Sequence, residues 1–240
     1  MKIFGVEVNN CSEREILKHL EASPQNEGMA TVANLNPEIL LLAGEDSKFR
    51  EALNDFDIKI VDGFGVCLVV FVKHFKKIAR TPGADLAGKV LKTSVKRGLK
   101  VGLVNKSGGL SAQADLEERF AGIPSIEVFQ LGEDDNYAEF AKKNLQEADV
   151  VLAGLGAPEQ EKFIAEAKKA LPNLKLAMGV GGTLDYWSGK QKRAPLWLRK
   201  LGLEWLFRFY RHPRRAGRIF RATIIFPAKA LLDKKEATKK

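Results

Sequence analysis

The chain has 240 residues, of which 45% are hydrophobic and 29% are charged, with 21 glycines and 9 prolines. These proportions are those of a globular protein with a sizeable core, and they exclude a collagen-like, low-complexity or largely disordered chain. Lys and Arg outnumber Asp and Glu by 39 to 30, which gives a formal net charge of +9.

The positive charge is concentrated at the C-terminal end. Residues 189–240 contain 16 Lys and Arg against 3 Asp and Glu, a balance of +13, whereas residues 1–188 contain 23 against 27, a balance of −4. This asymmetry indicates an anionic partner for the end of the chain, such as phosphate, nucleic acid or an anionic lipid surface. A solubilising tail is the simpler alternative, but it would not need the aromatic residues found there.

The N-terminal sequence and the cysteines indicate the compartment. Cys11 and Cys67 are the only cysteines and both lie beside apolar residues, which argues against a disulfide framework or a cysteine zinc site. The N-terminus lacks the apolar core of a signal peptide, and no apolar run approaches the roughly 20 residues of a membrane-spanning helix. We therefore expect a cytoplasmic protein.

Short β-like runs alternate with helical patterns through residues 1–188. A first unit pairs Lys2–Val8 with a helix from Ser12, whose spacing to Glu15 is that of a capping box. The predicted strands that follow are 29–33, 58–61, 100–104, 126–130, 149–153 and 175–178. The predicted helices between them are 37–54, 84–97, 109–120, 137–147 and 158–171. Because parallel strands need crossover helices, this alternation predicts a Rossmann-like α/β fold, a parallel sheet flanked by helices.

The alternation ends at Gly189, where a basic segment rich in aromatic residues begins. We predict an α/β core over residues 1–188 and a helical appendage over residues 189–240, and we expect the core to fold without the appendage. Aromatic side chains among arginines are typical of an element at a membrane interface. A C-terminal helix docked on the core is the alternative.

Ligands of open parallel sheets bind beyond the carboxyl ends of the strands. Asp62 stands at such an end before Gly63-Phe-Gly65, where it could act as a general base or could simply cap a turn or helix. Asn34 and Asn36 could bond a sugar or base, or could cap the helix that begins at Pro37. Arg80 could clamp a phosphate or lie on the surface. Asn105 opens a further polar strand end.

Two glycine-rich turns follow later strands. These turns could offer N–H groups to a phosphate or uracil, or could be tight packing turns. The first is Gly154-Leu-Gly156-Ala-Pro158-Glu-Gln160-Glu161, and the second is Gly179-Val-Gly181-Gly182-Thr183, which continues to Asp185. Neither is a G-x-G-x-x-G fingerprint, and the P-loop signature and a zinc-type histidine pair are absent. Asp55-Phe-Asp57 precedes its strand, at the wrong end for a site. The sequence therefore predicts no metal site and no cofactor.

In order and spacing, these motifs resemble the WecG/TagA/CpsF glycosyltransferase family over essentially the whole chain. The residues that carry the resemblance are Asn34-x-Asn36-Pro37-Glu38, Asp62-Gly63-x-Gly65, Arg80-x-x-Gly83-x-Asp85, Gly156-Ala-Pro158-x-Gln160-Glu161, Gly179-Val-Gly181-Gly182-x-Leu-Asp185, Arg193-Ala-Pro195, Gly202-Leu-Glu204-Trp205 and Pro213-Arg214-Arg215.

The resemblance implies an inverting, metal-independent enzyme that moves an N-acetylmannosamine-type sugar from a UDP donor to a polyprenyl-diphosphate-linked N-acetylglucosamine. Such enzymes build a cell-surface polysaccharide or teichoic acid on the inner face of the cell membrane, which the C-terminal tail helps them to reach. Homo-oligomers are a further expectation. A nucleic-acid-binding protein that uses the basic tail is the alternative, and under the transferase interpretation no nucleic acid is expected as a partner.

The resemblance also implies site residues. Asp62 matches the suspected base, and Arg80 and Gln160 match residues implicated in catalysis. Asn34 stands where the family commonly has threonine, so we expect it to position groups rather than to relay a proton. The predicted substrate-binding residues are Asn36, Gly63, Asn105, Gly156, Gly181, Gly182 and Asp185, with the tail arginines Arg208, Arg214, Arg215 and Arg218.

Overall fold

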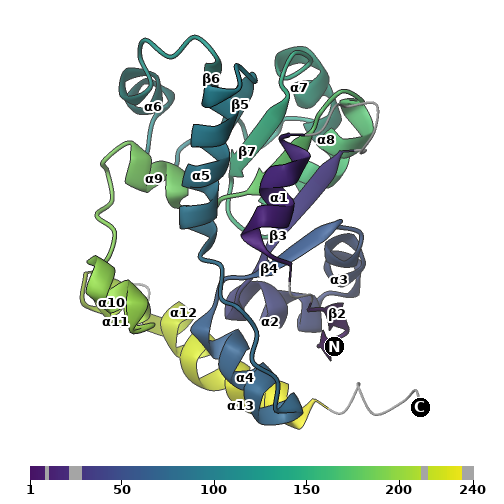
Figure 1. Ribbon diagram of the computed structural model, residues 1–240, viewed down its shortest axis with the longest axis vertical. Coiled ribbons are helices and arrows are strands. Elements are labelled where there is room, and N and C mark those ends of the chain that lie inside the picture. The colour runs from purple at the N-terminus through teal and green to yellow at the C-terminus, as the bar shows by residue number, and fades with distance from the viewer. Residues whose placement is uncertain (9–10, 22–28, 212–215, 234–240) are drawn as a thin grey trace.

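The computed structural model describes residues 1–8, 11–21, 29–211 and 216–233. A six-stranded sheet forms its centre, in the order β4-β3-β8-β7-β5-β6, and every neighbouring pair is parallel (Figure 1). The strands are β3 (Ala30–Leu35), β4 (Ile58–Val61), β5 (Val101–Lys106), β6 (Ile126–Leu131), β7 (Val150–Gly154) and β8 (Leu176–Gly179). The predicted Rossmann-like fold is confirmed, and each predicted strand is present within a residue or two of its expected bounds.

Helices cover both faces of the sheet because strand side chains alternate between two apolar cores. In β3, for example, Val32 points into one core while Ala33 and Leu35 point into the other. The helices on the Val32 face are α1 (Glu13–His19), α5 (Gly83–Lys96), α6 (Gln113–Arg119) and α9 (Thr183–Trp187). Those on the opposite face are α2 (Pro37–Glu45), α3 (Ser47–Asn54), α7 (Tyr137–Asn144) and α8 (Glu159–Ala170).

The N-terminal unit differs in part from its prediction. β1 (Lys2–Ile3) and β2 (Val6–Glu7) form a separate antiparallel hairpin rather than a strand of the central sheet. The capping box of α1 is confirmed, since the Ser12 hydroxyl accepts from the Glu15 N–H and the Glu15 carboxylate accepts from the Ser12 N–H.

Two further departures concern helices. The single helix predicted over residues 37–54 is broken at Asp46, whose carboxylate accepts from the N–H groups of Lys48 and Phe49 and so begins α3. An unpredicted helix, α4 (Phe64–His74), follows β4. Its sequence is apolar almost throughout, so it shows no helical alternation of polar and apolar residues.

The basic segment forms short helices that run across the end of the molecule where β3 and β4 finish (Figure 1). They are α10 (Leu196–Lys200), α11 (Glu204–Arg211), α12 (Ala216–Phe220), the π-helical turn η2 (Arg221–Ile225) and α13 (Phe226–Leu232). Helix α13 packs against α4, and Phe226 is fully buried with its ring in edge-to-face contact with Phe4 at 6.2 Å.

The buried Phe226 has a consequence for the expected independence of the core. Removing residues 189–240 would uncover the apolar surface that Phe226 and Ala230 fill, so we expect the core alone to be less stable than the full chain. In the described part of the chain, no helix combines the length and apolar character needed to cross a membrane.

Candidate functional site

Asp62 and Asn34 meet at the carboxyl ends of β4 and β3, which are neighbours in the sheet. The Asp62 N–H donates to the Leu35 carbonyl at 2.9 Å, so the backbone that leaves β4 stays beside β3. The Asn34 Nδ2 donates to the Gly179 carbonyl at the end of β8, at 2.7 Å. The predicted convergence of polar side chains at this edge is therefore present.

Gly83, the first residue of α5, brings the two side chains together. A Cβ atom at Gly83 would lie 2.4 Å from Asn34 Nδ2 and 2.9 Å from Asp62 Oδ2, so both side chains fit against its Cα. The Asn34 Oδ1 is buried and has no hydrogen-bond partner among the residues that the structure describes. Since a buried acceptor without a donor is costly, this atom is suited to receive a donor from a ligand.

Asn36 caps the helix that follows β3. Its Oδ1 accepts from the N–H groups of Glu38 at 2.9 Å and Ile39 at 3.0 Å, which confirms the capping alternative for this residue. Gly63 lies beside the same helix, because a Cβ there would approach the Pro37 Cδ to 2.6 Å. Asn36 therefore fixes the start of α2, and Gly63 lets the chain after β4 pass close to that start.

Gln160 lies at the start of α8 and is held by contacts from two directions. Its Oε1 accepts from the Gly181 N–H at 3.0 Å, and its Nε2 donates to Glu161 Oε1 at 2.7 Å. Gly179 also adjoins it, since a Cβ there would lie 2.7 Å from Nε2. Gln160 thus reaches the same backbone segment, after β8, that Asn34 contacts.

Glu161, beside Gln160, was not predicted as a site residue. Its side chain is buried, and its Oε2 meets no hydrogen-bond partner in the described part of the chain. Burial raises the pKa of Glu161 to about 7, against the opposing effect of the Gln160 hydrogen bond. The Gly156-Ala-Pro158-x-Gln160-Glu161 motif contained this residue, but only the fold shows that it contacts the Gln160 amide.

Arg80 and Asp85 connect the core to the appendage. The Arg80 Nη2 donates to the Arg199 carbonyl at 3.1 Å, at the end of α10. The Asp85 carboxylate accepts from Arg193 at 2.6 Å and from Arg199 at 3.1 Å. Burial alone would raise the pKa of Asp85, but Arg193 and Arg199 outweigh it and hold the pKa below its ordinary value. We call Arg80, Asp85, Arg193 and Arg199 the arginine clasp.

Arg80 lies in a segment that passes the end of β4, because the N–H of the next residue, Thr81, donates to the Val61 carbonyl at 2.8 Å. Burial raises the pKa of the Cys67 thiol. The positive charge of Arg80 lowers this pKa, and the negative charge of Asp62 raises it further. Both charged groups therefore lie within electrostatic range of Cys67, near the start of α4. The Arg80-x-x-Gly83-x-Asp85 motif thus places Gly83 against Asn34 and Asp62 and joins the core to the appendage through Arg80 and Asp85.

Replacing Asp85 with asparagine should loosen the appendage. The variant leaves Arg193 and Arg199 without their carboxylate, and we expect it to lower the free energy of unfolding by about 1–2 kcal/mol at neutral pH, because Asp85 is partly exposed. The contribution of the Asp85 ion pairs to the free energy of unfolding is present above about pH 4 and is lost as the pH falls through the lowered pKa of Asp85.

Chemical denaturation measures the free energy of unfolding of the Asp85→Asn variant. Glu166→Gln is the control, because Glu166 pairs with Lys169, whose side chain is exposed. Equal effects of the two variants would contradict a role for the clasp.

Asn105 and Asp185 belong to a second cluster, at the end of β5. The Asn105 Nδ2 donates to the Ser111 carbonyl at 2.6 Å, and the Ser111 hydroxyl donates to Asp185 Oδ1 at 2.7 Å. The Ser188 hydroxyl lies 2.7 Å from that of Ser111. The predicted site residues therefore divide into a group around Asp62 and Gln160 and this group around Ser111.

The remaining predicted glycines lie in the turns after β7 and β8. Gly156 and Gly181 have φ values of +80° and +50°, in the left-handed region that favours glycine. Gly182 precedes α9 as its cap residue. Tight turns are thus confirmed as one use of these glycines, and the Gly181 N–H is used by Gln160.

Among the tail arginines, Arg218 forms a two-pronged ion pair with Glu38, at 2.7 and 2.9 Å. This contact places α12 against the beginning of α2, beside Gly63. The Arg208 side chain, Arg214 and Arg215 lie outside the described residues, so their predicted roles stay predictions.

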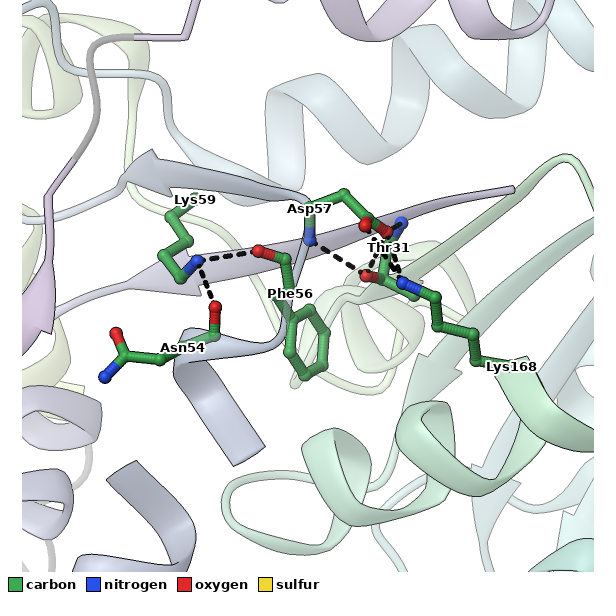
Figure 2. Close-up of polar contacts among 6 residues, drawn as sticks. All are labelled: Thr31, Asn54, Phe56, Asp57, Lys59 and Lys168. Atoms are coloured by element: carbon green, nitrogen blue, oxygen red, sulfur yellow. Dashed lines mark hydrogen bonds and ion pairs between the residues drawn. The ribbon is translucent and has the colours of Figure 1, made fainter. Parts of the chain in front are cut away.

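Asp57 precedes β4, at the end of the strand opposite to Asp62, and Figure 2 shows its polar contacts. Its carboxylate accepts from the Thr31 hydroxyl at 2.7 Å and from Lys168 Nζ at 2.8 Å, and these groups outweigh burial to lower the pKa of Asp57. Nearby, Lys59 is buried and donates to the carbonyls of Asn54 and Phe56, and burial lowers its pKa. The carboxylate thus ties β3 and α8 to the start of β4.

A polar cavity of about 250 Å³ also lies at the amino ends of strands, lined by residues of β5 and β6, by the end of α7 and by the segment that joins α7 to β7. It contains none of the predicted site residues, and in parallel α/β sheets this edge is the one opposite the ligand. Within the described ranges, no group of three or more His, Cys, Asp or Glu side chains is arranged to hold a metal ion.

The chain was compared with models of known protein families. The model of the glycosyl transferase WecG/TagA/CpsF family matches residues 1–240, the whole length.

Proposed function

Because the chain belongs to the WecG/TagA/CpsF glycosyltransferase family, and is thus a glycosyltransferase of cell-surface polysaccharide synthesis, we propose its reaction in finer terms. It transfers an N-acetylmannosamine-type sugar from UDP to a polyprenyl-diphosphate-linked N-acetylglucosamine, with inversion at the anomeric carbon and without a metal ion. The product is an early unit of a cell-surface polysaccharide or teichoic acid.

The observation that carries this proposal is the position of Asp62. Its carboxylate lies at the end of β4 against Gly83, which the Asn34 side chain also adjoins, and the backbone beside Arg80 bonds to the last residue of β4. Attack by a sugar hydroxyl requires a base to remove its proton as the bond to the anomeric carbon forms. Asp62 is the base in this proposal, and Asn34, with its unpartnered Oδ1, orients a donor group of one substrate.

The departing UDP gains negative charge, which nearby cations must stabilise. Arg80 precedes Thr81, whose N–H donates to the Val61 carbonyl next to Asp62, and guanidinium groups suit diphosphate oxygens because they can bind them in pairs. Helix α4 begins beside Asp62 with no side-chain cap and no acidic residue in its first turn, whereas α8 has Glu159 and Glu161 there. A helix N-terminus attracts anions unless such carboxylates occupy it. We therefore place the diphosphate near α4 and Arg80.

The remaining groups bind the sugar and uridine portions. Gln160 and the turn that contains Gly181 lie on the far side of Asn34 from Asp62, joined to it through Gly179. The acceptor is bound to a lipid, so we propose that the enzyme works on the inner face of the cell membrane, with the appendage in contact with that membrane.

The structure offers the nucleic-acid alternative less support than the sequence did. Several basic residues of the segment are engaged by carboxylates of the core: Arg193 and Arg199 by Asp85, Arg218 by Glu38, and Arg221 and Lys229 by Glu45. These contacts give five of the 16 basic residues of the segment a carboxylate partner inside the chain.

A donor panel tests the proposed function. UDP release is measured with UDP-N-acetylmannosamine, its uronic acid, UDP-N-acetylglucosamine and UDP-glucose, each with a short-chain lipid-diphosphate N-acetylglucosamine and with EDTA present. We expect release with an N-acetylmannosamine-type donor only when the acceptor is present, and no loss in EDTA. Release with a different donor would correct the sugar, and release abolished by EDTA would contradict the metal-independent reaction.

A further inference from the structure

Helix α4 has an apolar face that the reaction proposed above leaves unused. Val66, Val69 and Val70 are buried in the core, but the opposite side of the helix is also apolar. The side chains on that exposed side are 45% to 85% accessible and comprise Leu68, Phe71, Val72 and Phe75. Their spacing of three and four residues places them in one stripe along the helix. A contiguous exposed apolar stripe on a globular protein marks a contact surface.

The stripe continues onto the appendage. Phe64, at the start of α4, packs against Gly202 between α10 and α11, where a Cβ would lie 3.1 Å from its ring. Exposed apolar side chains follow on these helices, namely Trp197, Leu201, Trp205, Leu206 and Phe209. On the other flank α13 packs against α4 and exposes Leu231 and Leu232. Figure 1 shows α4, α10, α11 and α13 at the same end of the molecule.

Phe75 gives a second, independent observation. It ends α4 in the left-handed conformation, with φ +52°, and is 85% exposed. Glycine or asparagine is favoured at such a position, and a bulky residue there is strained. The folded protein gains nothing evident from a solvent-exposed phenylalanine in a strained conformation, so the side chain is suited to a contact outside the chain.

The charges around the stripe identify its partner. Lys76 and Lys77 follow α4 and are exposed, and Lys200 and Arg211 are exposed on α10 and α11. Nearby carboxylates on α2 are engaged by arginines of the appendage, as for Glu38 with Arg218. An apolar and aromatic surface rimmed by exposed cations suits an anionic bilayer, where rings enter the headgroup boundary and cations meet lipid phosphates. A second copy of the chain would instead bring like charges together.

We propose that the exposed stripe of α4 is a membrane-docking surface of the catalytic core itself, which inserts into the headgroup region of an anionic bilayer beside the appendage. Helix α4 begins two residues after Asp62, so its insertion fixes the height of the candidate base above the lipid that holds the acceptor. This docking role rests on the proposed function, because that function supplies the lipid-linked acceptor. Vesicle binding itself can be measured without any acceptor or transferase activity.

The experiment compares full-length variants in co-sedimentation with vesicles of phosphatidylcholine and phosphatidylglycerol. The variant Leu68→Gln/Phe71→Gln/Phe75→Ser is expected to bind at least about tenfold more weakly than the wild type. Leu110→Gln is the matched control, because Leu110 is 54% exposed but lies in the loop before α6, and its binding should change less than about twofold. Wild-type binding by the triple variant, or an equal loss in the control, would overturn the proposal.

A second variant excludes misfolding as the cause. Phe75→Asn relieves the left-handed strain, so it should fold at least as stably as the wild type and still bind vesicles more weakly. If instead Phe75→Asn and the triple variant keep vesicle binding and lose a dimer seen by analytical ultracentrifugation, the stripe is an interface between copies and the proposal is wrong.

The activity of the triple variant separates this inference from the proposed function. With a short-chain, water-soluble acceptor, turnover should stay within about twofold of the wild type, whereas with a long-chain acceptor in vesicles it should fall with binding. Loss of vesicle binding with no transferase activity in the wild type on any acceptor would support the docking surface and refute the proposed function.

Discussion

Replacing Asp62 with asparagine is expected to reduce kcat by about 10²–10⁴-fold, because the amide cannot take the proton of the attacking hydroxyl. The substitution keeps the size of the side chain, and the backbone contact from the Asp62 N–H to the Leu35 carbonyl is unaffected. The fold should therefore remain, and KM for the donor should change little. Steady-state UDP release with the lipid-linked acceptor measures both constants.

Asp57→Asn is the matched control, since it makes the same chemical change at the other end of β4. The carboxylate of Asp57 binds Thr31 and Lys168, and its loss should lower the free energy of unfolding by about 1–2 kcal/mol, because the group is partly exposed. Its kcat should stay within about twofold of the wild type. A large kcat loss in both variants would show that β4 is merely sensitive to substitution.

Replacing Gly83 with alanine is expected to reduce kcat/KM by about 100-fold or more. The new Cβ would stand 2.4 Å from Asn34 Nδ2 and 2.9 Å from Asp62 Oδ2, so at least one of the two side chains must move. Displacement of reacting groups by about 1 Å is enough for such a loss. The comparison of kcat/KM with the wild type measures it directly.

Gly88→Ala, one turn later in the same helix, supplies the control. A Cβ at Gly88 meets no atom within 4 Å, so alanine should raise stability by about 0.5–1 kcal/mol through its helix propensity and leave kcat/KM unchanged. Equal kcat/KM for both variants would contradict the close assembly of Asn34, Asp62 and Gly83.

The sequence was sufficient for the sheet because its strands are buried on both faces and separated by turn residues. Helix α4 could not be predicted, since its exposed face is apolar and the usual helical alternation is missing. The break at Asp46 was also missed, because a capping aspartate inside a periodic pattern resembles a surface residue. The helix that could not be predicted is the one whose exposed surface serves a partner in our proposal.

The candidate site was predictable as a set of strand ends but not as a set of contacts. Asp62 and Asn34 follow from the rule that parallel strands present their carboxyl ends at one edge. The contact of Gly83 with both of them, and the binding of Asp85 to Arg193 and Arg199, depend on long-range packing that no local spacing encodes. The role of Phe226 in the core was hidden for the same reason.

The stereochemistry of the product is the most direct test of the central claim, that one carboxylate at the end of β4 assists a single displacement at the anomeric carbon. The disaccharide made from an α-linked UDP donor is released from its lipid and its anomeric configuration is determined by NMR. We predict a β linkage, because attack from the face opposite UDP inverts that carbon. An α linkage would require a second displacement or front-face attack, and would contradict the assignment of Asp62 as the base.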